Sequence, residues 1–324
     1  MEYTQFGQTE LFVSRIAFGT WAFGGDWGDV EVEASKQAIR RALDLGITFF
    51  DTAQAYGFGA AENVLGEALK PEISNGREKI IIATKGGLRM QGKTLVRDAS
   101  PSWLRQGVEE SLRHLGTDYI DLYQVHWPDP ATPFEETAAA LDKLVEEGKI
   151  RYVGVSNYNV PQMQTFARGG RLDALQPAYH LFRREIENEI LPYTKQHGIG
   201  VLVYGPLAHG LLSGKFTPDQ HFPANDWRSK SSFFQGDTFR KNLEVVNKLQ
   251  TWAAQRGRSV AELAIAWTLA HPAVHVAIVG ARNAQQIEQT ASAASWHLTP
   301  EELEEINIMM RAAVPVGGPT PEGM

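Results

Sequence analysis

Four residues of chemically reactive types follow three successive apolar stretches of the chain. Asp51 ends the first stretch, and Tyr56 lies in the loop after it. Lys85 ends the second stretch and His126 ends the third. A carboxylate, a phenol, an amine and an imidazole can each bind, release or stabilise a proton. If the stretches are neighbouring parallel strands, which lie about 4.8 Å apart, the four side chains can share one small volume.

Each of these residues also has a plain structural explanation when it is taken alone. A lysine or histidine at a strand end often forms an ion pair or a core hydrogen bond, and Asp51 can cap a turn. The motif Gly57-x-Gly59-x-x-Glu62 lacks the third glycine of the dinucleotide-binding fingerprint, so we interpret it as a loop leading into a helix. The chemical interpretation therefore depends on the combination of the four residues.

Eight apolar stretches rich in β-branched residues predict the strands that position this set. They lack strict alternation of apolar and polar residues, as expected for strands covered on both faces. They span residues 15–21, 47–53, 80–87, 119–127, 150–157, 174–179, 200–207 and 275–282. Helix-like segments lie between them, and three begin with Ser-Pro or Thr-Pro, a signal for a helix start. These three span residues 100–116, 132–148 and 299–310.

Eight alternating strands and helices predict an α/β fold, a single (β/α)8 TIM barrel that forms one domain over residues 1–324. A doubly wound sheet is the competing architecture, but it usually has fewer strands, and a complete G-x-G-x-x-G motif does not occur in the sequence. We expect residues 1–14 to form a hairpin under the barrel floor and 205–235 a long loop after the seventh strand. We expect residues from about 313 to 324 to form a flexible tail.

Composition narrows the classes of function and partner. The 324 residues are 43% hydrophobic, carry a net charge of −7 and include no cysteine, which excludes disulfides and thiolate chemistry. A basic patch, an apolar run of about 20 residues and the features of a secretory signal are not found in the sequence. We therefore expect a soluble, cytoplasmic protein, a monomer by default, without a nucleic-acid or membrane partner. The sequence also lacks a recognisable metal-ligand cluster.

Five blocks resemble the signature segments of the aldo-keto reductase superfamily: "FFDTAQAYG", "IIATKGG", "YQVHWPDP", "VGVSNY" and "YGPLAHGLLSGK". The resemblance covers about residues 3 to 312. The segment "QPAYHLFRREIENEILPY" resembles the bacterial general-stress-protein branch more than the mammalian aldose reductases. The resemblance implies the barrel fold and an NADPH-dependent oxidoreductase that reduces aldehydes or ketones to alcohols without a metal.

The same resemblance implies a role for each catalytic candidate. Tyr56 is the general acid, and the Lys85 cation favours its phenolate, because tyrosine with its usual pKa of about 10 is a weak acid. Asp51 holds Lys85 and keeps it charged. His126 donates a hydrogen bond to the carbonyl oxygen of the substrate and stabilises the charge that develops there.

Residues that contact the cofactor are implied at three places along the chain. The nicotinamide end would be bound by Gly19, Thr20, Trp21, Asp51, Ser156, Asn157, Gln176 and Tyr179. Tyr179 matches the aromatic residue that stacks on the ring. The pyrophosphate would be covered by Tyr204, Gly205, Pro206, Leu207, Gly210, Ser213 and Lys215. The adenosine end would be bound by Gly280, Arg282, Gln286 and Gln289.

Three departures from the family pattern bear on the choice of cofactor. Gly205 stands where relatives commonly have serine, and Gln289-Thr290 stands where they usually have Glu-Asn. Gly280-Ala281 replaces the Lys-Ser of the mammalian branch, which leaves Arg282 as the main cation for a 2′-phosphate. NADP(H) is favoured because a guanidinium suits that group, and NAD(H) stays open.

The expected substrate is a small carbonyl compound held beside Tyr56 and His126 by Trp21, Trp27 and Trp127. Two alternatives come from other classes of function. One is a nucleotide-binding redox sensor or regulatory subunit of the same fold with slow turnover. The other is a barrel isomerase or hydrolase, which would leave the Asp-Tyr-Lys-His set unexplained.

Overall fold

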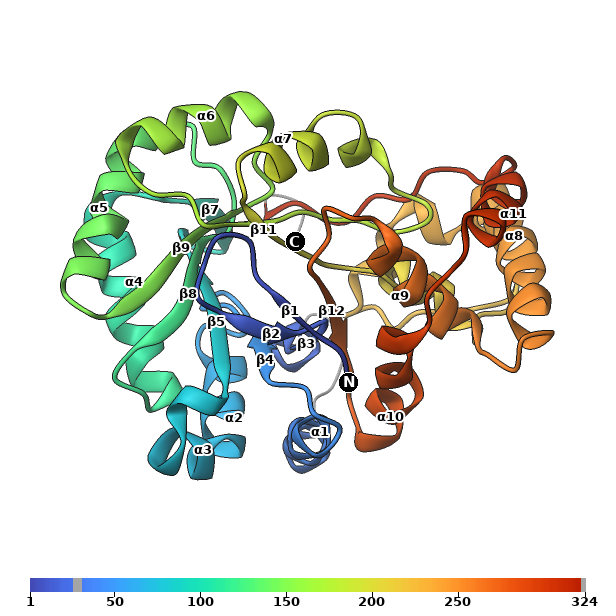
Figure 1. Cartoon of the computed structure of the whole chain (residues 1–324), viewed down its shortest axis with the longest axis horizontal. Coiled ribbons are helices and arrows are strands. Elements are labelled where there is room, and N and C mark those ends of the chain that lie inside the picture. The colour runs from blue at the N-terminus through green and yellow to red at the C-terminus, as the bar shows by residue number, and fades with distance from the viewer. Residues whose placement is uncertain (26–30, 322–324) are drawn as a thin grey trace.

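A closed barrel of eight parallel strands forms the centre of the molecule (Figure 1). The computed structural model describes residues 1–25 and 31–321. Around the barrel the strand order is β10, β11, β12, β3, β4, β5, β8 and β9. These strands are β3 (Ile16–Gly19), β4 (Phe49–Asp51), β5 (Ile81–Gly86), β8 (Ile120–Val125), β9 (Ile150–Ser156), β10 (Ala174–Gln176), β11 (Gly200–Val203) and β12 (Val276–Gly280). The predicted (β/α)8 barrel and all eight predicted strands are confirmed.

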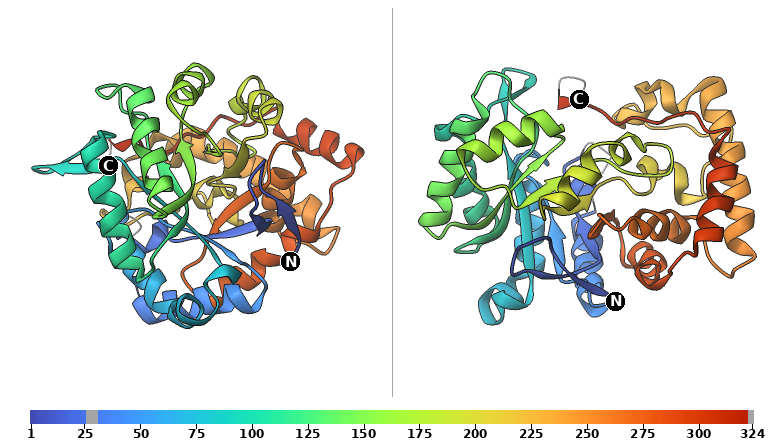
Figure 2. Two further views of the ribbon diagram at one scale, coloured as in Figure 1. Left: turned by 60° about the vertical axis from the view of Figure 1, so that its left-hand side comes forward. Right: turned by 45° about the horizontal axis from the view of Figure 1, so that its top comes forward.

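Helices surround the barrel, as Figures 1 and 2 show. They are α1 (Val32–Asp44), α2 (Ala60–Ala68), α3 (Lys70–Asn75), α4 (Pro101–Leu115), α5 (Phe134–Glu146), α6 (Val160–Gly169), α7 (Ile190–Gln196), α8 (Gly236–Ala254), α9 (Val260–Ala270), α10 (Ala284–Ala291) and α11 (Pro300–Met310). The three helices predicted from Ser-Pro and Thr-Pro starts are α4, α5 and α11. In α11 the Thr299 side chain and the Glu302 side chain bond each other's backbone N–H, which fixes the first turn.

Two hairpins are added to the barrel, and only one was predicted. The antiparallel pair β1 (Tyr3–Gln5) and β2 (Phe12–Ser14) confirms the expected hairpin in residues 1–14. The pair β6 (Leu88–Gln91) and β7 (Thr94–Arg97) follows β5 and was not predicted; it projects from the body of the molecule in the left view of Figure 2. Its turn contains Gly92 with a φ of 65°, a conformation that glycine adopts without strain.

The long segment after β11 is a loop with three short 3-10 helices, η4 (Ala208–Ser213), η5 (Trp227–Lys230) and η6 (Ser232–Phe234). Arg228 of η5 donates from Nη1 to the carbonyl oxygen of His209 at 3.0 Å, which joins η5 to η4. The C-terminal segment, expected as a flexible tail, is attached to the barrel: the Val316 N–H donates to the carbonyl oxygen of Phe182 at 3.0 Å, and Val316 is buried.

Two separate cores result from the alternation of side chains along the strands. One fills the barrel and includes Phe49, Ile81 and Leu122, together with Phe6 of the N-terminal segment. The other lies between the barrel and the helices and includes the next residue on β4, Phe50. Successive strand residues thus face opposite cores, and this alternation decides which polar side chains reach the barrel axis.

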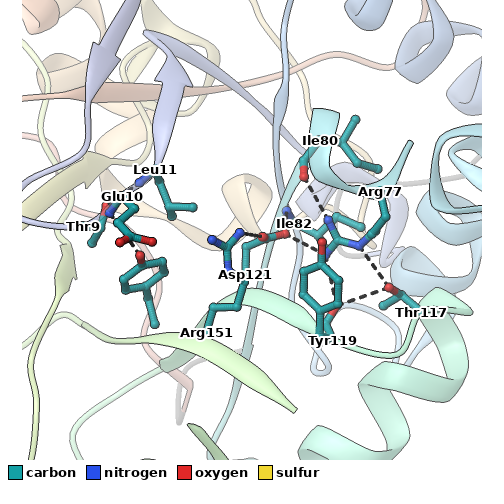
Figure 3. A network of polar contacts seen from close by, with 11 residues as sticks. Thr9, Glu10, Leu11, Arg77, Ile80, Ile82, Thr117, Tyr119, Asp121 and Arg151 are labelled. Carbon is teal, nitrogen blue, oxygen red and sulfur yellow. Dashed lines mark hydrogen bonds and ion pairs between the residues drawn. The ribbon is translucent and has the colours of Figure 1, made fainter. Parts of the chain in front are cut away.

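The barrel floor carries a saturated polar network, drawn in Figure 3. Arg77 of η2 (Arg77–Lys79) forms an ion pair of 2.6 Å with Asp121, at the start of β8. Asp121 also accepts from Arg151 at 2.9 Å and from the Ile82 N–H at 3.0 Å. The remaining donors of Arg77 bond Thr117, Ile80 and Tyr119.

Candidate active site

The inward-facing rows of the strands bring the four predicted catalytic residues together at the barrel mouth. Asp51 and Lys85 each stand an even number of residues after a strand residue whose side chain belongs to the core inside the barrel. Because side chains alternate along a strand, both also point inward. Lys85 pairs in register with Gln124, and His126 lies two residues further along the chain from that glutamine. Asp51, Tyr56, Lys85 and His126 are therefore neighbours, as the sequence predicts.

Lys85 is fully buried at the centre of this group. Its Nζ donates to Asp51 Oδ1 and to the carbonyl oxygen of Thr52, both at 2.7 Å, and lies 3.5 Å from the Tyr56 hydroxyl oxygen. Burial lowers the pKa of Lys85, and the negative charges of Asp51 and Glu62 oppose that shift. The two short contacts fix the ammonium, and the third, longer one places its positive charge close to the Tyr56 hydroxyl.

Tyr56 is held by a tight loop and by two neighbouring rings. The residues after it, Gly57, Phe58 and Gly59, all have positive φ (64°, 47° and 98°), so the chain reverses sharply before α2. The Tyr56 ring stacks on Trp21 at 6.2 Å between centroids and meets the edge of His126 at 5.6 Å. The phenol thus has a fixed orientation at the mouth of the barrel.

His126 is held neutral beside the phenol. Burial, and then the nearby Lys85 cation, lower the pKa of His126 well below its ordinary value. Its Nδ1 is buried and has no hydrogen-bond partner among the described residues. A neutral imidazole carries one N–H, so His126 can donate one hydrogen bond to an oxygen placed over Tyr56.

A second polar group continues from Asp51 around the barrel. The Gln176 amide donates to Asp51 Oδ2 at 2.9 Å and to Gln124 Oε1 at 3.2 Å, and the Ser156 hydroxyl donates to the Gln176 carbonyl oxygen at 2.8 Å. The Asn157 amide donates to the His126 carbonyl oxygen at 3.2 Å. Gln124 was not among the predicted residues, although its position two residues before His126 places it in the same inward row.

Tyr179, predicted to stack on the nicotinamide ring, does not face the barrel mouth. It is 1% exposed, its ring packs 5.0 Å from Trp267 of α9, and its hydroxyl donates to Glu187 at 2.7 Å. Tyr204 lies instead against the core inside the barrel, and its hydroxyl donates to Asn157 Oδ1 at 2.9 Å. This position does not favour the predicted stacking of Tyr179 on the nicotinamide ring, which stays a prediction, and Tyr204 is the aromatic side chain that bonds Asn157.

The loop predicted to cover the pyrophosphate follows Tyr204 at the same end of the barrel. Gly205 and Gly210 have φ of 71° and 95°, and the Lys215 side chain is exposed. The remaining predicted members of the loop are Pro206, Leu207 and Ser213. The Ser213 hydroxyl accepts from the Lys215 N–H at 3.3 Å, a contact within the loop.

Glycines open the surface between the ends of β3 and β12. Gly19 and Gly280 are register partners there, and a Cβ on Gly19 would lie 2.6 Å from Ile278 Cγ2. The neighbouring Thr20 is buried, and its hydroxyl has no partner among the described residues. The two glycines leave the backbone at these strand ends without side chains, which would let a dinucleotide approach it closely.

The region predicted to bind the adenosine end has two arginines rather than one. Arg282 is exposed, and its N–H donates to Gln286 Oε1 at 2.7 Å, so the Gln286 side chain is engaged in capping α10. Burial and the nearby Arg228 cation lower the pKa of Arg282, and Asp226 opposes this. Gln289 is exposed on α10. Arg228 was not predicted, because it comes from the loop after β11 and no strand-end pattern marks it.

Aromatic residues surround the mouth beside Tyr56. Trp21 contacts His209 of η4, and His209 contacts Trp227 of η5, with 6.2 Å and 5.0 Å between ring centroids. Trp127 follows His126, and the Arg97 guanidinium of β7 lies 5.2 Å from its ring centre. His209, Trp227 and Arg97 were not predicted. Trp27, which was predicted, lies outside the described residues.

Two further kinds of site are not found in the described part of the chain. Within residues 1–25 and 31–321, no three histidine, aspartate or glutamate side chains gather closely enough to hold a metal ion. Over the same ranges, none of the helices combines the length and the apolar character needed to cross a membrane.

Comparison with known proteins identifies the class to which this barrel and site belong. The sequence model of the aldo/keto reductase family matches residues 15–311, so the chain belongs to that family. It is 44% identical to aldo-keto reductase YhdN of Bacillus subtilis (strain 168), over 98% of this chain and 96% of that protein. It is 33% identical to the NADH-specific methylglyoxal reductase of Escherichia coli (strain K12), over 92% and 95% of the two chains.

A solved structure agrees with this assignment. The glycerol dehydrogenase AKR11B4 from Gluconobacter oxydans superposes with a TM-score of 0.88, at 39% identity and over 98% of both chains. The family includes oxidoreductases such as the methylglyoxal reductase and the glycerol dehydrogenase named above, and aldo-keto reductases use nicotinamide cofactors.

Proposed function

We propose that this protein reduces aldehydes or ketones to alcohols with NADPH as hydride donor and Tyr56 as general acid. The observation that carries the proposal is the position of Lys85, whose ammonium is fixed by Asp51 and Thr52 and lies 3.5 Å from the Tyr56 hydroxyl. A buried cation at that distance favours release of the phenol proton. Few structural roles need a buried lysine directed at a tyrosine at the mouth of a barrel.

Each residue at the mouth has a separate role in the reduction. A bound reduced nicotinamide supplies the hydride that adds to the carbonyl carbon. As the C=O π bond opens, the oxygen gains negative charge and takes the proton from the Tyr56 hydroxyl, which leaves a phenolate beside the Lys85 ammonium. Neutral His126 donates a hydrogen bond to the same oxygen and orients it. Asp51 keeps the ammonium in place throughout.

Cofactor binding is supported by the groups on either side of this centre. Asn157, Ser156 and Tyr204 form a hydrogen-bonded wall suited to the carboxamide and the ring, while Lys215 and Arg282 supply positive charge for the phosphates. The arginine favours NADPH. The departures at Gly205 and Gln289, and the NADH specificity of the E. coli relative, make NADH a second donor to be tested.

The substrate side carries the aromatic rings of Trp21 and His126 beside Tyr56, with Trp127 next to His126 in the chain. Stacked rings favour flat or apolar carbonyl compounds, and short hydroxylated aldehydes also fit beside the polar group at the mouth. A small-molecule carbonyl compound is therefore the proposed substrate class.

Oxidation of NADPH and NADH at 340 nm, measured with a panel of aromatic, aliphatic and hydroxylated aldehydes, tests the proposal. Steady turnover with NADPH that is lost in Tyr56→Phe is the expected result. Tight NADPH binding with only a single slow turnover would instead favour the redox sensor of the same fold. Failure of all the aldehydes and ketones with both cofactors would overturn the proposed reaction.

A further inference from the structure

A buried carboxylate lies behind the active site, on the outer side of the barrel wall. Glu62 is in the first turn of α2 and is 0% exposed. Its Oε1 accepts from the Thr84 hydroxyl at 2.6 Å, and its Oε2 lies 3.3 Å from Nδ1 of His114 on α4. A buried carboxylate is costly unless hydrogen bonds or charges stabilise it. Burial of Glu62 therefore requires these two partners, and the reaction mechanism proposed above does not use the residue.

Two features tie Glu62 to the catalytic centre. Thr84 immediately precedes Lys85 on β5. The Thr84 side chain points outward and bonds Glu62, the Lys85 side chain points inward, and one peptide bond joins the two residues. Glu62 also begins the helix that follows the Tyr56 loop, and the Ala61 N–H donates to the Tyr56 carbonyl oxygen at 3.2 Å. Glu62 thus clamps the far end of that loop onto the strand that carries the lysine.

We propose that Glu62 is a further positioning residue of the active site: its buried carboxylate anchors the Tyr56 loop to β5 and adds a second negative charge, beside that of Asp51, behind the Lys85 ammonium. This inference rests on the proposed function, because it assigns Glu62 to the ionisation of the Tyr56–Lys85 pair. Glu62 makes no hydrogen bond with Lys85. Its charge acts through the barrel wall, where few dipoles can reorient to screen it.

The titratable groups that face Glu62 come from three elements of the barrel and its helices. Glu62 faces His114 from α4 and Tyr123 from β8, besides Lys85 itself. Burial, and then Glu62 and Glu110, raise the pKa of Tyr123, so its phenol stays neutral. The His114 side chain, which is 22% exposed, lies 3.3 Å from the Glu62 carboxylate.

The sign of the effect follows from the charges. Lys85 is faced by Asp51, Tyr56, His126 and, through the wall, Glu62. Removing a negative charge near an acid makes its proton easier to lose, whether that proton is on the phenol or on the ammonium. Neutralising Glu62 should therefore move the alkaline limb of kcat/KM to lower pH, by about one pH unit for a charge several ångströms away. In alcohol oxidation Tyr56 must accept the proton instead, so there the acidic limb should move to lower pH.

Glu62→Gln is the decisive variant, because its amide can keep the bonds to Thr84 and His114 while the charge is lost. The pH profiles of both reaction directions are measured for wild type, Glu62→Gln and Thr84→Val, with NADP⁺ affinity and thermal stability measured for each. The expected result is a downward shift in Glu62→Gln and an unmoved limb in Thr84→Val, which loses the hydroxyl bond but keeps the carboxylate. A purely structural role predicts lower stability in both variants and no shift in either.

His114→Lys gives an independent test if Glu62→Gln does not fold. A permanent cation beside the intact carboxylate should shift the limb downward as well, by less than the glutamine does. Unmoved limbs in the folded variants, together with an inactive Tyr56→Phe, would overturn the role of Glu62 and leave the proposed function standing. An active Tyr56→Phe would overturn both.

Discussion

The two ends of the barrel each bury a carboxylate with a cation, and the two pairs differ in how completely their hydrogen bonds are made. At the floor, every side-chain nitrogen of Arg77 donates to an oxygen, and both oxygens of Asp121 accept. At the mouth, Lys85 makes two short contacts and one of 3.5 Å with the Tyr56 hydroxyl. Buried atoms there without a partner among the described residues are Thr20 Oγ1, Thr52 Oγ1, Gln124 Nε2 and His126 Nδ1.

This difference indicates that the pair at the floor contributes to stability, whereas the pair at the mouth is available for chemistry. Buried polar atoms are nearly always hydrogen-bonded in folded proteins, and each open one costs about 1–3 kcal/mol. The saturated network of Arg77 and Asp121 holds β5, β8 and β9 together and leaves none of the polar atoms of these two side chains for a ligand. The mouth accepts the cost of open groups, which a cofactor and a substrate can satisfy. Variants at the two ends should therefore fail in different ways.

The largest expected effect is at the mouth. Tyr56→Phe removes only the hydroxyl that donates the proton, so kcat should fall by about 10³- to 10⁴-fold. The melting temperature and the affinity for NADP⁺ should stay close to wild type, because the ring contacts with Trp21 and His126 are kept. Steady-state kinetics and a thermal melt give both values. Retention of more than about a tenth of the activity would remove Tyr56 as the acid.

The matching variant at the floor is Asp121→Asn. It leaves the buried Arg77 without its counter-charge, so the free energy of unfolding should fall by about 3 kcal/mol, while kcat/KM of the folded protein stays unchanged. Denaturant unfolding and kinetics measure the two quantities. A large loss of activity in the folded variant would show that the two ends are not independent.

A smaller effect is expected at the adenosine end. Arg282→Ala should weaken NADPH binding by about 10- to 150-fold and NADH binding much less, because a charge-assisted contact with phosphate contributes about 1.5–3 kcal/mol. Fluorescence titration with both cofactors measures this. Arg228→Ala is the matched variant from the loop after β11. Equal losses for both cofactors in Arg282→Ala would mean that Arg282 does not contact the 2′-phosphate.

The smallest effect concerns pH and stability. Burial, with nearby arginines, lowers the pKa of His209 to about 3, and the left-handed φ of 56° at this position is one that asparagine tolerates. The unfolded chain binds this proton first, so its stabilising contribution is present above about pH 6.5 and is lost as pH falls toward 3. His209→Asn should flatten the fall in stability between pH 6.5 and 4.5 by up to about 1.4 kcal/mol per pH unit.

The control for that variant is His221→Asn, at an exposed histidine of the same loop. It should leave the pH dependence of stability as it is in wild type. Denaturant unfolding at several pH values gives the comparison, and equal slopes for wild type and His209→Asn would contradict the buried, neutral state of His209.

The four predicted catalytic residues could be recognised as neighbours because three of them lie at a strand end and Tyr56 lies in the loop after Asp51. A strand end and its alternation are local properties, so Asp51, Lys85 and His126 could be placed without contacts from elsewhere in the chain. The position of Tyr179 follows from the same rule: Gln176 faces the barrel, so a side chain three residues later faces the helices, whereas Tyr204 lies two residues beyond the inward Leu202.

Other parts of the site depend on contacts between distant segments. Arg228 and Trp227 reach the mouth because the loop after β11 folds back over η4, and Arg97 reaches it on a hairpin marked only by a short turn. The burial of Glu62 depends on α4, which supplies His114 from about fifty residues along the chain. No single stretch of sequence carries these relationships.

Transfer of deuterium tests the central claim most directly. The protein is incubated with NADPH that carries deuterium at both positions of C4 of the nicotinamide and with the best aldehyde of the panel, and the product is analysed by mass spectrometry. We expect an alcohol with one deuterium on the former carbonyl carbon, formed by wild type and by Asp121→Asn and nearly absent with Tyr56→Phe. An alcohol without deuterium, or equal deuterated product from Tyr56→Phe, would contradict it.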